Sequence, residues 1–240
     1  MRVFLGSLLF NLGFYFFTAV TVLTSLPLLA LPRGVLLYVL RRYTWVTEAM
    51  LRVFCGVRVQ VEGADNIPPG AVLIVSKHQS AFDTVFWLGR LPDPCYVMKI
   101  ELMRIPVWSW LARKCGMISV DRDGGATALR TMVKAARAAA DAGRQIVIYP
   151  EGTRAVPGMT EPYQPGVAAI AAAARVPVVP VATNSGVFWG KKAFQKRPGV
   201  IRVKILPALP PGLVRAKLMA ELEARIEGES LAMLDPVRTP

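Results

Sequence analysis

The chemistry open to this sequence starts from His78, which is the single histidine in the chain. Asp83 follows it five positions later, in the segment KHQSAFD. A carboxylate beside an imidazole fixes the ring tautomer and stabilises the imidazolium, so the other ring nitrogen can take a proton near neutral pH. The two residues are therefore a candidate catalytic dyad, with His78 as the general base for a hydroxyl group.

The spacing of the pair predicts how the two side chains can meet. Five residues along one continuous helix rotate about 140° past each other, which would point the side chains apart. Ser80 and Asp83 fit the S-x-x-D pattern of a helix start, so we expect His78 to lie before a helix and Asp83 in its first turn. The alternative is that Asp83 only caps the helix and that His78 is an ordinary surface residue.

A second polar cluster, PEGTR at residues 150–154, follows the apolar run QIVIY. Its functional candidates are Glu151, Gly152, Thr153 and Arg154. The arginine offers a planar group that binds phosphate through two hydrogen bonds, and the glycine exposes backbone N–H groups. Ligands of open α/β sheets bind outside the carboxyl ends of the strands, so we expect both clusters to share one site. A simple strand-to-helix turn is the alternative for this segment.

Arg122 is a third candidate for the same site, because it follows the short apolar run MISV. It has acidic neighbours on both sides, Asp121 and Asp123. An ion pair with either aspartate explains the arginine equally well, and the sequence favours neither interpretation.

The elements that must position these residues form an alternating pattern after residue 57, typical of an α/β fold. Runs such as AVLIVS are apolar on both faces, which predicts a mixed, largely parallel sheet covered by helices. The clearest predicted helix is Ala126–Ala142, with Gly143 as its C-cap. Another helix follows Gly166, and Ala216–Ile226 is predicted as a surface helix without a function. The predicted strands are Val57–Val61, Ala71–Ser76, Cys95–Met98, Met117–Val120, Gln145–Tyr149, Val178–Ala182 and Val200–Leu206.

The N-terminal segment is predicted to contact membrane lipid, because no charged residue occurs from Val3 to Leu31. Pro27 and Pro32 interrupt it before a second, amphipathic segment that runs to about residue 57. A spanning helix followed by an interfacial one fits this pattern, and so does a hairpin that dips into one leaflet. A signal peptide fits poorly, because the apolar run exceeds the usual h-region of about 7–15 residues.

The distribution of charge predicts the orientation of the chain. Arg33, Arg41 and Arg42 follow the apolar run whereas only Arg2 precedes it, which places the α/β part on the cytoplasmic side of the inner membrane. We therefore divide the chain into a membrane-associated helical segment, 1–56, and an α/β domain, 57–240.

The composition supports a membrane surface as the partner and excludes other classes. A net charge of +13 accompanies 53% hydrophobic residues, whereas a soluble nucleic-acid-binding protein is rarely so apolar, so we expect no nucleic-acid partner. The three cysteines are odd in number and lack C-x-x-C spacing, which indicates neither disulfides nor a zinc site. With one histidine, clustered-histidine metal sites are excluded, and we expect no metal.

In their order and separation, four motifs resemble those of the glycerolipid acyltransferase family, particularly its 1-acylglycerol-3-phosphate acyltransferases. The motifs are H-x4-D, a G-x5-R segment that ends at Arg122, EGTR, and the Val-Pro-rich strand at 176–180, where Pro180 is the matching residue. The resemblance spans about residues 57–207. Lys77 departs from the pattern, since the family often has asparagine there, and so does Ser119-Val120, which replaces an aromatic-isoleucine pair.

The resemblance implies that 57–240 is an acyltransferase domain. It implies a catalytic dyad of His78 and Asp83, with acyl-CoA or acyl-carrier protein as the acyl donor and no other cofactor. The lysophospholipid acceptor would be lysophosphatidic acid, acylated at the sn-2 hydroxyl to give phosphatidic acid. The predicted substrate-binding residues are Arg122, Glu151, Gly152, Thr153, Arg154 and Lys77.

In this reaction His78 deprotonates the acceptor hydroxyl, and backbone donors hold the tetrahedral oxyanion. A covalent role for Ser80 is disfavoured, because the sequence has no G-x-S-x-G elbow. Glycerol 3-phosphate and a lyso-ornithine lipid are alternative acceptors. A non-catalytic basic membrane anchor is the alternative from another class, but it explains neither motif that follows a strand.

Overall fold

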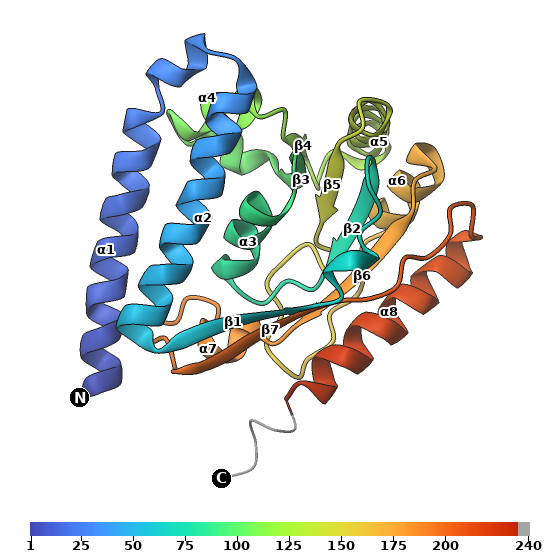
Figure 1. Cartoon of the computed structure of the whole chain (residues 1–240). Coiled ribbons are helices and arrows are strands. Elements are labelled where there is room, and N and C mark those ends of the chain that lie inside the picture. Colours follow the sequence, from blue (N-terminus) through green and yellow to red (C-terminus); the bar gives the residue numbers. More distant parts are fainter. Residues whose placement is uncertain (235–240) are drawn as a thin grey trace.

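The computed structural model describes residues 1–234, in which seven strands form one sheet in the order β1-β7-β6-β2-β5-β3-β4 (Figure 1). Neighbouring strands are parallel except for the antiparallel pair β6 and β7. The predicted mixed, largely parallel sheet is confirmed. The strands are β1 (Val57–Glu62), β2 (Val72–Ser76), β3 (Pro94–Lys99), β4 (Ile118–Val120), β5 (Gln145–Ile148), β6 (Val178–Thr183) and β7 (Gly199–Ile205).

The central strands are buried on both faces, as their continuous apolar sequences predict. In β2, Leu73 and Val75 belong to the cluster that packs under α5 (Gly125–Asp141), α6 (Gly166–Ala174) and α8 (Arg215–Ala232). Val72 and Ile74 point to the other face, into the cluster that packs against the N-terminal helices. Figure 1 shows the sheet between these two layers. Alternation of side chains along each strand thus divides the core into two halves.

The predicted helices are present with small shifts in their ends. α5 matches the prediction within one residue at each end, and Gly143 follows it in the left-handed conformation, φ 75°, that a helix C-terminus favours. α8 begins one residue before the predicted tail helix and runs six residues further. The shorter helices α4 (Trp108–Lys114) and α7 (Ser185–Phe188) were not expected, because each is too short to produce a clear periodic pattern.

The N-terminal segment is a hairpin of α1 (Arg2–Thr24) and α2 (Arg33–Cys55), joined by the 3₁₀ helix η1 (Pro27–Ala30) (Figure 1). Residues 2–30 are long and apolar enough to cross a membrane. However, the first half of α1 packs on the domain, where the Phe10 ring is 5.1 Å from the Trp189 ring. Ser7 Oγ also accepts the Lys196 backbone N–H at 2.9 Å. The hairpin is therefore attached to the sheet rather than separate from it.

Much of the hairpin's apolar surface faces outward. The exposed apolar side chains of α1 are Val3, Phe4, Leu5, Leu9, Leu12, Tyr15, Phe16, Val20 and Leu23. On α2 they are Val35, Tyr38, Trp45, Val46, Val53 and Phe54. A soluble monomer rarely exposes so large an apolar patch, so this surface suits membrane association.

Helix α2 packs against α3 (Ala81–Arg90). The first turn of α3 contains Asp83, one of the predicted site residues. Gly89 lies against Thr44, and a Cβ at position 89 would come within 2.6 Å of the threonine methyl group. The Thr44 hydroxyl donates to the Val85 carbonyl at 2.8 Å, and Arg90 forms an ion pair with Glu48 at 2.8 Å. α2 ends at Cys55, and Gly56 turns the chain directly into β1. The division of the chain between residues 56 and 57 stays a prediction.

Candidate active site

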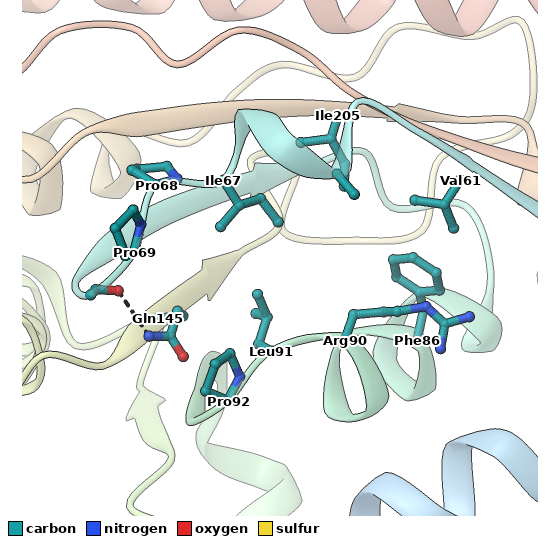
Figure 2. A pocket seen from close by; sticks show the side chains of 12 residues that line it. Val61, Ile67, Pro68, Pro69, Phe86, Arg90, Leu91, Pro92, Gln145 and Ile205 are labelled. Atoms are coloured by element: carbon teal, nitrogen blue, oxygen red, sulfur yellow. Dashed lines mark hydrogen bonds between the residues drawn. The ribbon is translucent and has the colours of Figure 1, made fainter.

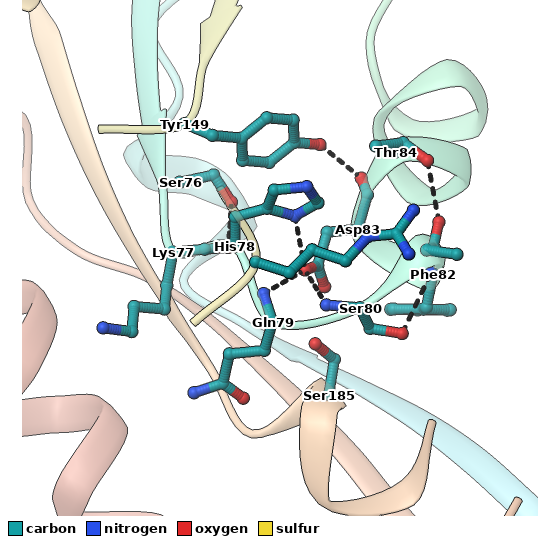
Figure 3. Close-up of polar contacts among 12 residues, drawn as sticks. Ser76, Lys77, His78, Gln79, Ser80, Phe82, Asp83, Thr84, Tyr149 and Ser185 are labelled. Carbon is teal, nitrogen blue, oxygen red and sulfur yellow. Dashed lines mark hydrogen bonds and ion pairs between the residues drawn. The ribbon is translucent and has the colours of Figure 1, made fainter. Parts of the chain in front are cut away.

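The dyad is formed at the junction of β2 and α3. His78 lies in the four-residue loop between them, and its Nδ1 is 3.1 Å from Oδ2 of Asp83 (Figure 3). The same oxygen accepts the backbone N–H groups of Gln79 at 2.7 Å and Ser80 at 2.8 Å. Asp83 is thus at position N3 of α3 and forms a capping box with the N-cap residue Ser80, as the S-x-x-D pattern predicts. The two interpretations are compatible, because one carboxylate both caps the helix and orients the imidazole.

The imidazole is held on its face by Tyr149, which follows β5. The two rings are stacked at 4.1 Å with an interplanar angle of 21°, and the Tyr149 hydroxyl donates to the Asp83 carbonyl at 2.8 Å. Burial raises the pKa of Tyr149, so the phenol stays neutral at physiological pH. The His78 side chain is 12% exposed, and its Nε2 makes no hydrogen bond within residues 1–234. This nitrogen is therefore available to a substrate hydroxyl.

The PEGTR segment lies directly against the dyad loop. The Ala155 N–H donates to the His78 carbonyl at 2.7 Å, and the His78 N–H donates to Oε1 of Glu151 at 3.3 Å. Gly152 closes the turn with a bond to the Tyr149 carbonyl at 3.0 Å, and its φ of 67° is one that residues with a Cβ adopt rarely. The structure therefore brings both predicted clusters to one edge of the sheet.

Arg122 reaches the same edge from the loop after β4. A Cβ at Gly152 would lie 3.3 Å from the guanidinium carbon of Arg122, so the two residues are in contact. In the described part of the chain Arg122 forms no ion pair with Asp121 or Asp123. Asp121 instead accepts the backbone N–H of Asp123 at 3.1 Å. Partial desolvation lowers the pKa of Arg122, but an arginine remains a cation.

Arg154 and Thr153 complete the PEGTR loop at its open side. Arg154 is half-buried near Tyr149, where its charge partly offsets the effect of burial on the phenol's pKa. Thr153 is exposed, and Lys191 donates to its hydroxyl at 3.4 Å and to the Arg154 carbonyl at 3.1 Å. The imidazole of His78 and several cations thus lie at one edge of the sheet, an arrangement suited to deprotonating a hydroxyl of an anionic substrate.

Comparison with known proteins identifies the family. The family model described as Acyltransferase matches residues 58–184, which include the dyad, Arg122 and the PEGTR segment. The chain belongs to this acyltransferase family. A 1-acyl-sn-glycerol-3-phosphate acyltransferase from Pseudomonas aeruginosa is 34% identical over 197 residues, covering 81% of this chain and 75% of that relative.

A human relative, 1-acyl-sn-glycerol-3-phosphate acyltransferase alpha, is 29% identical over 199 residues, covering 79% of this acyltransferase and 68% of the relative. A crystal structure of the 1-acyl-sn-glycerophosphate acyltransferase from Thermotoga maritima has a TM-score of 0.78 to this chain. That match covers 97% of this chain and 98% of the other at 24% identity, so it supports the fold alone.

Two of the acyltransferase's predicted substrate-binding residues are buried beneath the site rather than exposed in it. The Lys77 side chain is 1% exposed, and its Nζ lies 2.6 Å from Oε1 of Glu227 in α8. The Glu151 side chain is 0% exposed and bonds to the backbone of His78 and to Lys77. Burial raises the pKa of Glu151 to about 7, and the Lys77 charge opposes this shift. Neither side chain is placed to contact an acceptor in this structure.

Two residues at this edge, Lys99 and Tyr149, were not among the predicted site residues. Lys99 ends β3 and pairs in register with Val120, two residues before Arg122, so this lysine reaches the same edge of the sheet. It follows an apolar strand, which is the signal that singled out Arg122 and would have found it. Tyr149 was predicted only as part of a strand, and no local pattern shows that its ring stacks on a histidine 71 positions away.

A cavity of about 250 Å³ lies at the opposite edge of the sheet (Figure 2). It is bounded by the amino-terminal sides of β2, β3 and β5, near Gly70, Pro92 and Gln145, and by Val61 of β1 and Ile205 of β7. The dyad lies at the other edge. Across residues 1–234, no three histidine, cysteine, aspartate or glutamate side chains gather in a way that could hold a metal ion.

Proposed function

We propose that this acyltransferase transfers a fatty acyl group from an acyl thioester to the sn-2 hydroxyl of lysophosphatidic acid, giving phosphatidic acid. The observation that carries the proposal is the His78–Asp83 contact of 3.1 Å in a loop that bonds to the PEGTR turn, whose Gly152 contacts Arg122. The names of the Pseudomonas aeruginosa and human relatives, both 1-acyl-sn-glycerol-3-phosphate acyltransferases, support the choice of acceptor.

In the proposed reaction, His78 Nε2 takes the proton of the acceptor hydroxyl while the oxygen attacks the thioester carbonyl. Asp83 stabilises the imidazolium that forms, since its carboxylate lies against Nδ1. Collapse of the tetrahedral oxyanion breaks the carbon–sulfur bond, and the imidazolium returns its proton to the departing thiolate. Atoms and charges balance without an acyl-enzyme or a cofactor, and either acyl-CoA or acyl-carrier protein can serve as the donor.

The acceptor phosphate is assigned to the cations at the same edge. Arg122 and Arg154 can each bind phosphate oxygens through two hydrogen bonds, and Lys99 and Lys191 add positive charge. Gly152 belongs to this site because its missing side chain leaves room for the Arg122 guanidinium. Binding of the phosphate would orient the hydroxyl toward His78, which is the positional part of catalysis.

The N-terminal hairpin is proposed to hold the enzyme on the cytoplasmic face of the inner membrane. Its outward apolar side chains would enter one leaflet, while Arg33, Arg41 and Arg42 favour the anionic surface on the cytoplasmic side. The lysolipid acceptor and the product both partition into that leaflet. The hairpin thus brings the dyad to its substrate.

The test is thiol release from a long-chain acyl-CoA by the detergent-purified full chain, with three acceptors in parallel: lysophosphatidic acid, glycerol 3-phosphate and a lyso-ornithine lipid. We expect release with lysophosphatidic acid alone, and a loss of at least about a thousandfold in kcat in His78→Ala. Release with another acceptor only would change the substrate but not the mechanism. If no thiol is released with any acceptor, from either acyl-CoA or an acyl-carrier-protein thioester, the result would contradict acyl transfer.

A further inference from the structure

Beneath the dyad loop lies a cluster of buried charges that the proposed reaction does not use. Lys77 Nζ bonds to both carboxylate oxygens of Glu227, at 2.6 and 2.7 Å, and lies 3.4 Å from Oε1 of Glu151. Tyr163 donates to Oε1 of Glu227 at 2.9 Å. The side chains of Lys77, Glu151 and Glu227 are 1%, 0% and 11% exposed. One buried ammonium therefore serves two buried carboxylates from distant parts of the chain.

This cluster is a poor device for stability alone. Desolvating charged groups costs about as much free energy as their attraction regains, so apolar side chains of similar size would hold α8 on the sheet at least as well. Its position indicates another role. Glu151 Oε1 accepts a hydrogen bond from the backbone N–H of His78, and the same oxygen faces Lys77. A continuous chain of polar contacts thus connects α8 to the catalytic loop.

We propose that Lys77 and Glu227 are positioning residues whose ion pair holds the Glu151 carboxylate under the His78 backbone, which makes α8 part of the catalytic unit. The proposal rests on the proposed acyl transfer, because His78 matters only as its base. Glu227 lies outside the segment matched by the family model, residues 58–184.

The charge of Glu151 determines how strongly its carboxyl group accepts the hydrogen bond from the His78 backbone N–H. An ionised carboxylate is a stronger acceptor for the His78 N–H than a neutral acid. Burial raises the pKa of Glu151 to about 7 against the opposing charge of Lys77, so its ionisation depends on that lysine. The other titratable or charged groups that face the cluster are His78, Tyr149, Arg154, Tyr163, Glu223 and Glu227.

Two substitutions should move the pH profile in opposite directions. In Lys77→Met the carboxylate of Glu151 loses its cation, so its pKa rises, and activity is lost at a higher pH than in the wild type. In Glu227→Gln the carboxylate that competes for Lys77 is gone, so the ionised form of Glu151 is favoured, and the acidic limb moves to lower pH. We expect shifts of about one pH unit. A merely structural role would not produce opposite shifts.

The measurement is the pH dependence of kcat and KM with acyl-CoA and lysophosphatidic acid, on the full chain in detergent. In both variants we expect kcat to fall about tenfold, since a misplaced base is costly, while KM for the acceptor changes less than about twofold. Glu229→Gln is the matched control, because this α8 glutamate pairs with Lys204 at 2.7 Å on the surface. That variant should match the wild type.

The double variant Lys77→Met/Glu227→Met separates positioning from folding. Replacing the Lys77–Glu227 pair by apolar groups leaves Glu151 buried without its cation, where it would be a neutral acid, so the thermal unfolding midpoint should stay near that of the wild type. It should nevertheless retain the reduced kcat and the raised acidic limb. The inference would be overturned if the acidic limb of the pH profile were unshifted in both single variants, or if the double variant had the kcat of the wild type. Acyl transfer by the wild type would stand in either case. An inactive wild type would overturn the proposed function, and this inference with it.

Discussion

The two edges of the sheet differ in the way that separates a catalytic site from a cavity. The edge beneath Gly70 and Gln145 encloses about 250 Å³, but its lining is mostly apolar. Its two polar side chains serve the fold, since Gln145 donates to the Gly70 carbonyl and Arg90 pairs with Glu48. At the edge that carries His78, an imidazole, a carboxylate and several cations converge. The convergence of unlike polar groups, rather than cavity volume, therefore marks the candidate active site in this fold.

Apart from loss of His78 itself, Asp83→Asn is expected to lower kcat more than any other substitution at either edge of the sheet. The amide oxygen keeps an acceptor for the Gln79 and Ser80 N–H groups, so the helix cap survives, but the negative charge beside the imidazole is lost. We expect kcat to fall at least about a hundredfold, with the midpoint of thermal unfolding lowered by a few degrees at most. Steady-state kinetics and a melting curve on the same preparation check this.

Asp83→Ala is the companion variant. It removes both the charge and the cap, so it should lose the same activity and about 1 kcal/mol of stability in addition. Equal kcat in Asp83→Asn and the wild type would show that the carboxylate acts only as a helix cap.

Arg122→Ala should give a smaller effect on the same edge. Loss of its phosphate hydrogen bonds is expected to raise KM for lysophosphatidic acid about tenfold or more, because charge-assisted pairs are worth about 1.5–3 kcal/mol. The effect should weaken as salt screens the wild-type interaction. Arg137→Ala, which removes an exposed arginine paired with Asp141 on α5, is the control. An unchanged KM in Arg122→Ala would remove this arginine from the acceptor site.

Gln145→Ala tests the opposite edge and should have the smallest effect on catalysis. Its side chain accepts the Asp93 N–H at 2.8 Å and donates to the Gly70 carbonyl at 2.8 Å. Losing these buried bonds is expected to cost about 1–3 kcal/mol of stability, measured by denaturant unfolding, while kcat stays within about twofold. Gln60→Ala in β1, an exposed position, should change neither quantity. A large loss of kcat in Gln145→Ala would break the contrast between the edges.

Local patterns determined the elements and half of the site. The central strands β2, β5 and β6 were predictable because their continuous apolar runs are buried on both faces of the sheet, whereas β1 and β7 alternate buried and more exposed residues. α3 was predictable because its capping box lies within four residues. That PEGTR and H-x4-D would share an edge also followed from the sequence. Both segments follow strands that proved to be parallel neighbours, β2 and β5.

Only the tertiary structure decided which way each polar side chain points. Lys77 and His78 are adjacent in sequence, yet one is buried against Glu227 while the other stacks on Tyr149 with a nitrogen open. Glu227, the partner of Lys77, lies 150 positions away in α8, a helix for which the sequence predicted no function. Such contacts depend on how α8 packs across the sheet, and no local hydrogen bond or periodicity encodes that packing. The sequence alone therefore determined the elements and the dyad, whereas packing decided which charges face the substrate and which support the base from below.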